Sequence, residues 1–252
     1  MKKLGLIGFP LGHSFSKKYY LDKFEQENIK GIDYNLYSIE HIEQFPNLYK
    51  NDDSFYGFNV TIPHKQSVIA YMNELSPEAE KIGAVNCIKL TKKGDKPFLI
   101  GFNTDAYGFE ESLKPMLNEN HKTALVLGNG GAAKAVHYTL EKLGCSYKIV
   151  SRKRETGDIT YQELDQQLIA EHKLIINCSP VGTFPNVDDA PNIPYQGIGP
   201  QHLLYDLIYN PEETAFLKQG RQRGAQIKNG YDMLLLQAEK NWKIWNEDQA
   251  AM

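Results

Sequence analysis

The stretch that decides the fold is "TALVLGNGGAAKA", residues 123–135. A short apolar run, 123–127, leads directly into a turn of small residues, which reads Gly128-Asn129-Gly130-Gly131-Ala132-Ala133. In this G-x-G-x-x-A pattern the first glycine permits a tight turn, the second lets a pyrophosphate approach the backbone, and the small last residue lets strand and helix pack closely. The helix that follows would offer its first N–H groups to an anion. The stretch therefore predicts a dinucleotide-binding α/β unit, and a plain tight turn is the alternative.

The residues after the next predicted strand bear on the choice of dinucleotide. That strand, 147–151, ends at Ser151, where an NAD site has an acidic residue that binds the ribose 2′-hydroxyl. This chain continues with Arg152, Lys153 and Arg154 instead. Three cations suit a 2′-phosphate, which a carboxylate would repel, so the sequence favours NADP over NAD. A solvated basic loop is the alternative interpretation.

Apolar runs alternate with amphipathic stretches along all 252 residues. We expect strands at 4–9, 34–39, 55–62, 84–90, 98–103, 123–127, 147–151, 174–177 and 203–206, the fourth and fifth of them forming a hairpin. We expect helices at 16–28, from 41, and at 64–72, 104–117, 131–143, 161–170, 212–222 and 231–245. This alternation predicts an α/β fold with largely parallel sheets, in which a first unit ends near residue 103.

Composition excludes several classes of protein. Hydrophobic residues make up 41% and charged residues 23%, and the net charge is −3, without the basic excess that a nucleic-acid partner requires. No apolar stretch is long enough to predict a membrane span, and the start "MKKLGLIGFPLGHS" favours a buried strand over an export signal. Three scattered cysteines predict neither a disulfide framework nor a metal site, which indicates a reducing cytoplasm.

Polar side chains gather where several of the predicted strands end. They are Ser14, Ser16, Asn59, Thr61, Lys65, Asn86, Asn103, Thr104 and Asp105. Open α/β sheets bind ligands at the carboxyl ends of their strands, so together these side chains predict a pocket for a small polyhydroxylated anion. Taken singly, each has a plainer interpretation: the serines, Thr104 and Asp105 as helix caps, and Lys65 as a solvated side chain.

A series of motifs then resembles one family along the whole chain. The motifs are "FPLGHSFS", "NVTIPHK", "GAVN", "GFNTDAYGF", "GNGGAAKA", "LIINCSPVG", "YDLIYNP" and "NGYDMLLLQA", in this order. They resemble the motifs of shikimate dehydrogenase. The resemblance implies a small-molecule enzyme of aromatic amino acid biosynthesis, which reduces 3-dehydroshikimate to shikimate with NADPH.

The resemblance also implies a two-domain architecture. An N-terminal, mainly parallel α/β catalytic domain would span 1–103, bind the substrate and be completed by the C-terminal helix at about 230–252. A C-terminal Rossmann-type domain would span 104–229, begin with a linking helix and bind NADP. A monomer and a homodimer both fit this expectation.

The family's residue roles map onto matching positions of this chain. Ser14 and Ser16 would bind the substrate carboxylate together with Tyr209, and Lys65 would transfer a proton while Asp105 orients it. Contacts to substrate hydroxyls map to Asn59, Thr61, Asn86 and Gln237. Cofactor contacts map to the turn 128–133, to residues 151–154 and to Gly230, near the nicotinamide.

Some positions depart from the family's pattern. Lys17 stands where a proline is usual and His64 where an apolar residue is usual, and neither removes a proposed contact. The segment between Ser151 and Leu174 holds one clear helical pattern where the family has room for another helix, so we expect the wall around the adenine to be remodelled. The alternatives are a quinate/shikimate dehydrogenase that uses NAD, against which the basic residues argue, and a catalytically silent NADP-binding module, against which Lys65 and Asp105 argue.

Overall fold

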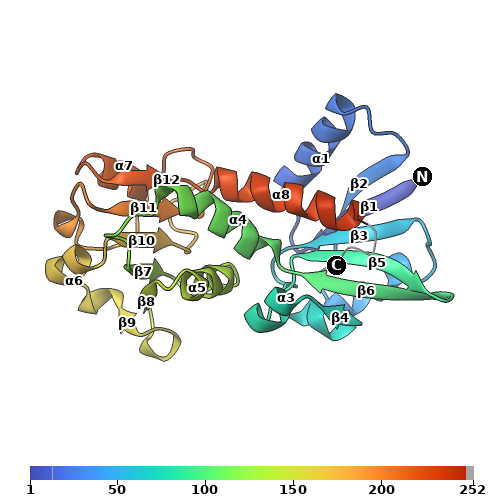
Figure 1. Ribbon diagram of the computed structural model, residues 1–252, viewed down its shortest axis with the longest axis horizontal. Helices are drawn as coiled ribbons and strands as arrows, with labels where there is room; N and C mark the ends of the chain where they lie inside the picture. The colour runs from blue at the N-terminus through green and yellow to red at the C-terminus, as the bar shows by residue number, and fades with distance from the viewer. Residues whose placement is uncertain (13, 248–252) are drawn as a thin grey trace. The chain divides into compact units, whose positions relative to one another are not determined.

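The computed structural model describes residues 1–12 and 14–247 of the chain, which separates into two compact units (Figure 1). The first unit comprises Met1–Thr104 and the chain from Ala238 onward, and the second comprises Asp105–Gln237. The last helix, α8 (Tyr231–Asn246), therefore contributes residues to both units. The expected end of this helix at 248–252 lies outside the described residues.

The first unit is built on a sheet with the strand order β2-β1-β3-β5-β6-β4. Its strands are β1 (Lys2–Gly8), β2 (Ile32–Ser38), β3 (Phe55–Val60), β4 (Glu74–Leu75), β5 (Cys87–Lys93) and β6 (Lys96–Phe102). Pairings are parallel except where β5 meets β3 and β6, which confirms the mainly parallel sheet and the hairpin.

The helices of the first unit are shorter than the amphipathic patterns predict. They are α1 (Phe15–Gln26), α2 (Pro46–Tyr49) and α3 (Pro77–Ile82), with 3₁₀ turns η1 (Ile42–Gln44) and η2 (Ser67–Tyr71). The helix expected at 64–72 was wrong, because the N–H groups of Ile69 and Met72 donate to carbonyls three residues back, which is 3₁₀ bonding.

Two apolar clusters cover the two faces of the first sheet. On one face Tyr20 and Phe24 of α1 pack with Trp245 of α8 over Leu4 and other strand residues. On the other face the short helical segments after β2 and β3 cover the sheet, through residues such as Phe45 and Val68. The sheet is therefore buried on both sides, so polar side chains on its strands must find partners inside the unit.

The second unit is built on a fully parallel sheet with the strand order β12-β11-β10-β7-β8-β9. Its strands are β7 (Thr123–Leu127), β8 (Ser146–Ser151), β9 (Ile159–Thr160), β10 (Leu174–Asn177), β11 (Leu203–Asp206) and β12 (Gln226–Lys228). Counted from β7, the strand order is that of the Rossmann fold, which confirms the predicted fold class.

Helices cover both faces of this second sheet (Figure 1). They are α4 (Thr104–Leu113), α5 (Ala133–Lys142), α6 (Gln166–Glu171) and α7 (Ala215–Arg221), with 3₁₀ turns η3 (Lys114–Met116), η4 (Arg154–Thr156), η5 (Tyr161–Glu163) and η6 (Tyr195–Gly197). Along β7, Ala124 and Val126 pack toward α4 and α5, whereas Leu125 and Leu127 pack toward α6 and α7. This alternation explains why the strand reads as a continuous apolar run.

Candidate functional site

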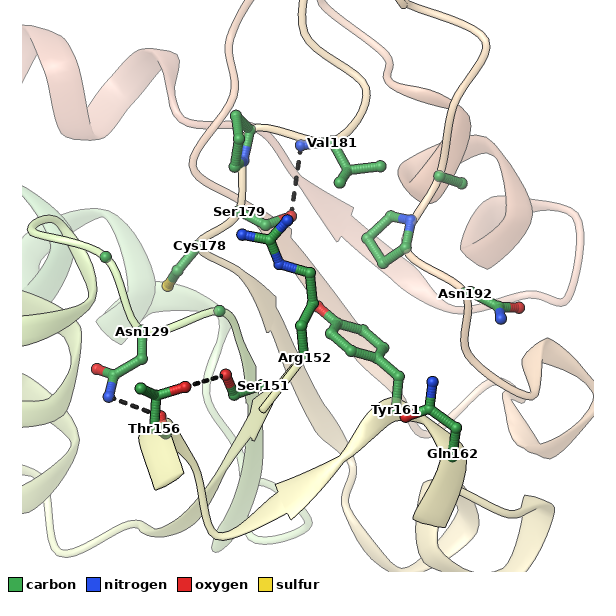
Figure 2. A pocket seen from close by; sticks show the side chains of 15 residues that line it. Asn129, Ser151, Arg152, Thr156, Tyr161, Gln162, Cys178, Ser179, Val181 and Asn192 are labelled. Carbon is green, nitrogen blue, oxygen red and sulfur yellow. Dashed lines mark hydrogen bonds between the residues drawn. The ribbon is translucent and has the colours of Figure 1, made fainter. Parts of the chain in front are cut away.

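A pocket of about 660 Å³ opens at the carboxyl ends of β7 and β10 in the second unit (Figure 2). Its lining comes from the glycine turn, from the segment after β8 and from the loop after β10: Gly128, Asn129, Gly130, Ser151, Arg152, Thr156, Tyr161, Gln162, Cys178, Ser179, Pro180, Val181, Ala190, Pro191 and Asn192. Strands β7 and β10 are neighbours at which the strand order reverses. This reversal is the position at which open α/β sheets bind dinucleotides.

The geometry of the glycine turn fits a bound pyrophosphate. Gly128 has a φ of +100°, and a Cβ there would lie 3.2 Å from the Ser179 nitrogen, so this position requires glycine. A Cβ on Gly130 or Gly131 would meet no atom within 4 Å, so the backbone beside them is open to a ligand. Ala133 begins α5 and is fully buried, as the small last residue of the pattern predicts, and Ala132 is its N-cap.

The three predicted cations differ in their surroundings. Arg152 lines the pocket, whereas in the described part of the chain neither Lys153 nor Arg154 does. Arg154 donates two hydrogen bonds to the Glu163 carboxylate, at 2.8 and 3.0 Å. Glu163 in turn accepts hydrogen bonds from the backbone and the hydroxyl of Thr160 at the start of η5. Arg154 is therefore engaged with its own segment, and Arg152 faces the pocket.

The segment after β8 forms one wall of this pocket. Thr156 connects the segment to both predicted cofactor elements: its carbonyl accepts from Asn129 Nδ2 at 2.9 Å, and its hydroxyl lies 2.6 Å from that of Ser151 (Figure 2). Tyr161 and Gln162 continue the wall. These residues carry no motif, so they could not be predicted from the sequence.

The loop after β10 forms another wall of the pocket. It belongs to the motif "LIINCSPVG", to whose residues no role was assigned from the sequence. Ser179 donates to Asn177 Oδ1 at 2.6 Å, and Asn177 Nδ2 donates to the Val181 carbonyl at 3.3 Å. Cys178 also lines the pocket, and burial raises the pKa of its thiol far above the usual value. The side-chain hydrogen bonds of Asn177 therefore fix the loop that lines this side of the pocket.

A buried carboxylate connects this loop to the next one. Asp206 ends β11, is fully buried and accepts from Asn177 Nδ2 at 3.0 Å, Thr214 Oγ1 at 2.6 Å and the Ile208 N–H at 3.0 Å. Burial raises the pKa of Asp206 to about 6, although the three hydrogen bonds that it accepts lower this pKa. Asp206 thereby anchors the loop after β11, which carries Tyr209.

The remaining predicted residues of the second unit lie in α4, in α8, just before α8 and in the loop after β11. Asp105 occupies the first turn of α4, and Gln237 is a buried residue of α8. Tyr209 is 38% exposed, and partial burial raises the pKa of its hydroxyl. Gly230 precedes α8, and a Cβ there would overlap the Leu207 carbonyl oxygen, so this position also requires glycine.

In the first unit the predicted substrate residues surround the ends of β1 and β3. Ser14 is the N-cap of α1, where its hydroxyl accepts from the Lys17 N–H at 3.4 Å, so the capping interpretation is confirmed for this serine. Ser16 lies in the first turn of the same helix. Thr61 and Lys65 follow β3 and are only partly exposed.

The departure at His64 has a structural reason. His64 is buried, and its Nε2 lies 2.7 Å from the Ile39 carbonyl oxygen, to which it can donate. The ring therefore connects the segment that carries Lys65 to the end of β2. An apolar side chain would fill the same space without this bond.

Two predicted asparagines are buried and hydrogen-bonded within the first unit. Asn59 is 5% exposed, and its Oδ1 accepts from the Tyr34 hydroxyl at 2.8 Å. Asn86 is 3% exposed, and its Oδ1 accepts from the Thr104 N–H at 2.7 Å while its Nδ2 donates to Thr104 Oγ1 at 3.0 Å. The Thr104 hydroxyl donates its own proton to Asn241 Oδ1 at 2.6 Å. Neither amide is thus free to rotate.

The described residues contain neither a metal-binding cluster nor a membrane-spanning helix. Within 1–12 and 14–247, His, Cys, Asp and Glu side chains form no group that could hold a metal ion. Over the same residues, none of the helices has both the length and the apolar character of a membrane span.

Comparison with known proteins supports the interpretation of both units. The family model for the shikimate dehydrogenase substrate binding domain matches residues 6–88. A shikimate dehydrogenase (NADP(+)) of Clostridium beijerinckii is 39% identical, over 99% of this chain and 93% of that protein. A crystal structure of a chorismate mutase/shikimate 5-dehydrogenase fusion protein from Clostridium acetobutylicum is 34% identical with a TM-score of 0.83, and covers 99% of this chain and 93% of that one.

A further solved structure is a complex with two ligands. It is shikimate 5-dehydrogenase from Thermus thermophilus in complex with NADP(H) and shikimate, 29% identical with a TM-score of 0.84 over 98% of this chain and 94% of that one. The resemblance found in the motifs is thus confirmed along nearly the full length of relatives more than 30% identical. The chain belongs to the shikimate dehydrogenase family.

Proposed function

We propose that this protein is an NADP-dependent shikimate dehydrogenase, which catalyses the reversible reduction of 3-dehydroshikimate to shikimate. The observation that carries the proposal is the pocket at the β7/β10 reversal, where Arg152 stands in place of the acidic residue of an NAD site. The family relationship supplies the substrate. Free thiols at Cys87, Cys145 and Cys178 fit a cytoplasmic enzyme.

We assign the two units to the two ligands. The domain over 1–103, completed by the C-terminal helix from about residue 230, binds shikimate, and the domain over 104–229 binds NADP. Support for the first assignment comes from the family model that matches residues 6–88, and support for the second from the Rossmann strand order. The enzyme acts on small molecules, as a monomer or a homodimer.

Backbone N–H groups and a cationic side chain would bind the cofactor. In our proposal the backbone of residues 128–133 receives the pyrophosphate, Ser151 and Arg152 contact the adenosine ribose, and Gly230 gives the nicotinamide room. Lys153 and Arg154 follow on the same segment without lining the pocket in the described part of the chain. Open space at Gly130 and Gly131 and the position of Arg152 support this arrangement. Arg152 is the residue that contacts the 2′-phosphate, because Arg154 is engaged with Glu163.

The substrate would be held by hydroxyls and amides. We assign Ser14, Ser16 and Tyr209 to the carboxylate of shikimate. Contacts to the substrate hydroxyls are assigned to Asn59, Thr61, Asn86 and Gln237. Fixed amide orientations at Asn59 and Asn86 support these contacts, because a preoriented donor loses little entropy on binding.

Lys65 and Asp105 are the proposed catalytic residues. Bound NADPH supplies the hydride, so the protein must move one proton to the carbonyl oxygen that becomes the hydroxyl. Lys65 donates this proton during reduction and accepts it during oxidation. Asp105 orients the ammonium group and accepts a hydrogen bond from a substrate hydroxyl.

A direct assay tests the function. Purified protein is mixed with shikimate or quinate and with NADP⁺ or NAD⁺, and the absorbance of reduced nicotinamide is followed. We expect turnover that is fastest with shikimate and NADP⁺. Faster turnover with quinate and NAD⁺ would favour the quinate/shikimate dehydrogenase, and no turnover in any combination would favour the silent module.

A further inference from the structure

We propose that Tyr34 is a positioning residue, which sets the orientation of the Asn59 amide so that an N–H group of this amide faces a substrate hydroxyl. This inference rests on the proposed function, because it takes Asn59 as a substrate contact. Nothing in the motif series assigns a role to Tyr34, which the sequence presents as one apolar position of the run "YNLYSI".

The register of the sheet brings the two residues together. Tyr34 on β2 stands opposite Leu4 of β1, and Asn59 on β3 stands opposite Leu6. Leu4 and Leu6 are two residues apart and so share one face of β1. Two strand spacings separate β2 from β3 by about 10 Å, and the long Tyr34 side chain spans most of this gap to reach the Asn59 amide on the same face.

The Tyr34 hydroxyl occupies the acceptor side of the Asn59 amide. It donates to Asn59 Oδ1 at 2.8 Å, with both groups buried. Asn59 Nδ2 donates to the Asn86 carbonyl at 3.4 Å, which uses one of its two N–H groups. Since the acceptor oxygen is held by the tyrosine, the other N–H is the group that the amide offers to a ligand oxygen.

Tyr34 itself cannot touch a ligand, because its exposed fraction is 0%. Its ring stacks on that of Tyr20, with centroids 4.7 Å apart. Burial raises the pKa of the Tyr34 hydroxyl well above its usual value, and an interaction with the Ser16 side chain opposes that rise. The phenol therefore stays protonated and remains a donor to Asn59, next to the serine assigned to the carboxylate.

Without the phenol, only the long bond from Asn59 Nδ2 to the Asn86 carbonyl, at 3.4 Å, still favours the native orientation of the amide. The flipped orientation, which presents an oxygen to the substrate, therefore becomes more populated. The variant Tyr34→Phe keeps the ring and its stacking and removes only the donor. We expect its KM for shikimate to rise about tenfold, equivalent to about 1.4 kcal/mol, a size typical of one buried hydrogen bond. The kcat should stay within about twofold, because the lost contact acts on ground and transition states alike.

The matched control is Tyr205→Phe. Tyr205 is also fully buried, and its hydroxyl lies 2.6 Å from Ser112 Oγ, which is no proposed contact. Both variants lose one buried hydroxyl, so both should melt at a lower temperature, but the control should keep the parent KM. An equal rise in KM for both variants would show that Tyr34 contributes stability alone.

A double-variant comparison tests whether Tyr34 acts through Asn59. In an Asn59→Ala background, Tyr34→Phe should raise KM no further, because the amide that it orients is gone. A full additional rise in this background would overturn the proposal. NADP⁺ binding measured by calorimetry should be the same in all of these variants.

A readout without substrate separates this inference from the proposed function. In ¹H–¹⁵N spectra of the ligand-free protein, the side-chain signals of Asn59, identified by their loss in Asn59→Ala, should shift in Tyr34→Phe and stay in place in Tyr205→Phe. Unchanged signals in Tyr34→Phe would refute the role of Tyr34. If the parent failed to turn over shikimate, the proposed function would fail, while these spectra would still decide the orientation of the amide.

Discussion

Replacement of Arg152 by alanine should lower the affinity for NADP⁺ and leave that for NAD⁺ nearly unchanged. Arg152 is the cation of the 152–154 trio that lines the pocket beside the glycine turn. A hydrogen bond to a charged group contributes about 1.5 to 3 kcal/mol, which is about one to two decades in the dissociation constant. NAD⁺ has no 2′-phosphate, so it lacks the partner for this charge.

The matched control is Arg154→Ala, two residues along the same segment. The Arg154 side chain is 60% exposed and paired with Glu163, and exposed pairs of this kind contribute about 0.2 to 1 kcal/mol. Its removal should change NADP⁺ affinity by less than about fivefold. Calorimetry at one fixed salt concentration compares both cofactors, because salt screens exposed charges. Equal losses for the two cofactors in Arg152→Ala, or a larger loss in Arg154→Ala, would refute the assignment.

Three further predictions concern catalysis, substrate binding and pH. Lys65→Met should keep the fold and lower kcat by about 10² to 10⁴, and Asp105→Asn should impair the same step. Steady-state kinetics measures kcat, and melting curves check the fold. Near-normal turnover of Lys65→Met would show that Lys65 is only a solvated side chain. Replacing Ser14 and Ser16 together by alanine should weaken shikimate binding in calorimetry while NADP⁺ binding persists, whereas unchanged shikimate affinity would leave the serines as caps. The pKa of Asp206 is about 6, above its ordinary value, so its contribution to stability is present at acidic pH and lost as pH rises through 6. The free energy of unfolding of Asp206→Asn should therefore rise relative to that of the parent between about pH 4 and 7, by up to about 3 kcal/mol. Urea titrations at several pH values measure this difference. A difference that stays constant across this range would contradict the raised pKa of Asp206.

The sequence was sufficient for the elements that have a strong period or an apolar run. Strands at 123–127, 174–177 and 203–206 were predicted with the bounds that the structure shows. The segments β4, β9, β12 and α3 were missed, because these short segments have neither a measurable period nor a continuous apolar run. The helix expected at 64–72 failed for a related reason: a 3₁₀ turn displays apolar residues at a spacing close to that of an α-helix.

The residues of the candidate site were likewise predicted only in part. The glycine turn and Arg152 could be predicted because their chemistry is local: one turn, one strand end and one charge. The engagement of Arg154 with Glu163 could not be predicted, because it depends on how the turns η4 and η5 fold back on each other. Charge counted along the sequence therefore overstated the number of cations that face the pocket.

Residues that act through others are the hardest to find from sequence. Asp206 and Tyr34 are both fully buried, and each holds a polar group whose partner lies on a different strand. A buried hydroxyl or carboxylate costs free energy unless its hydrogen bonds are made, so its presence in an apolar run is itself informative. In "LLYDLI" the carboxylate of Asp206 is the exception to an apolar run, and in "YNLYSI" Tyr34 carries a polar atom that is fully buried. Where the register of the sheet places such an atom next to a proposed ligand contact, as it places the Tyr34 hydroxyl next to Asn59, a role in orienting that contact can be tested against a role in stability alone.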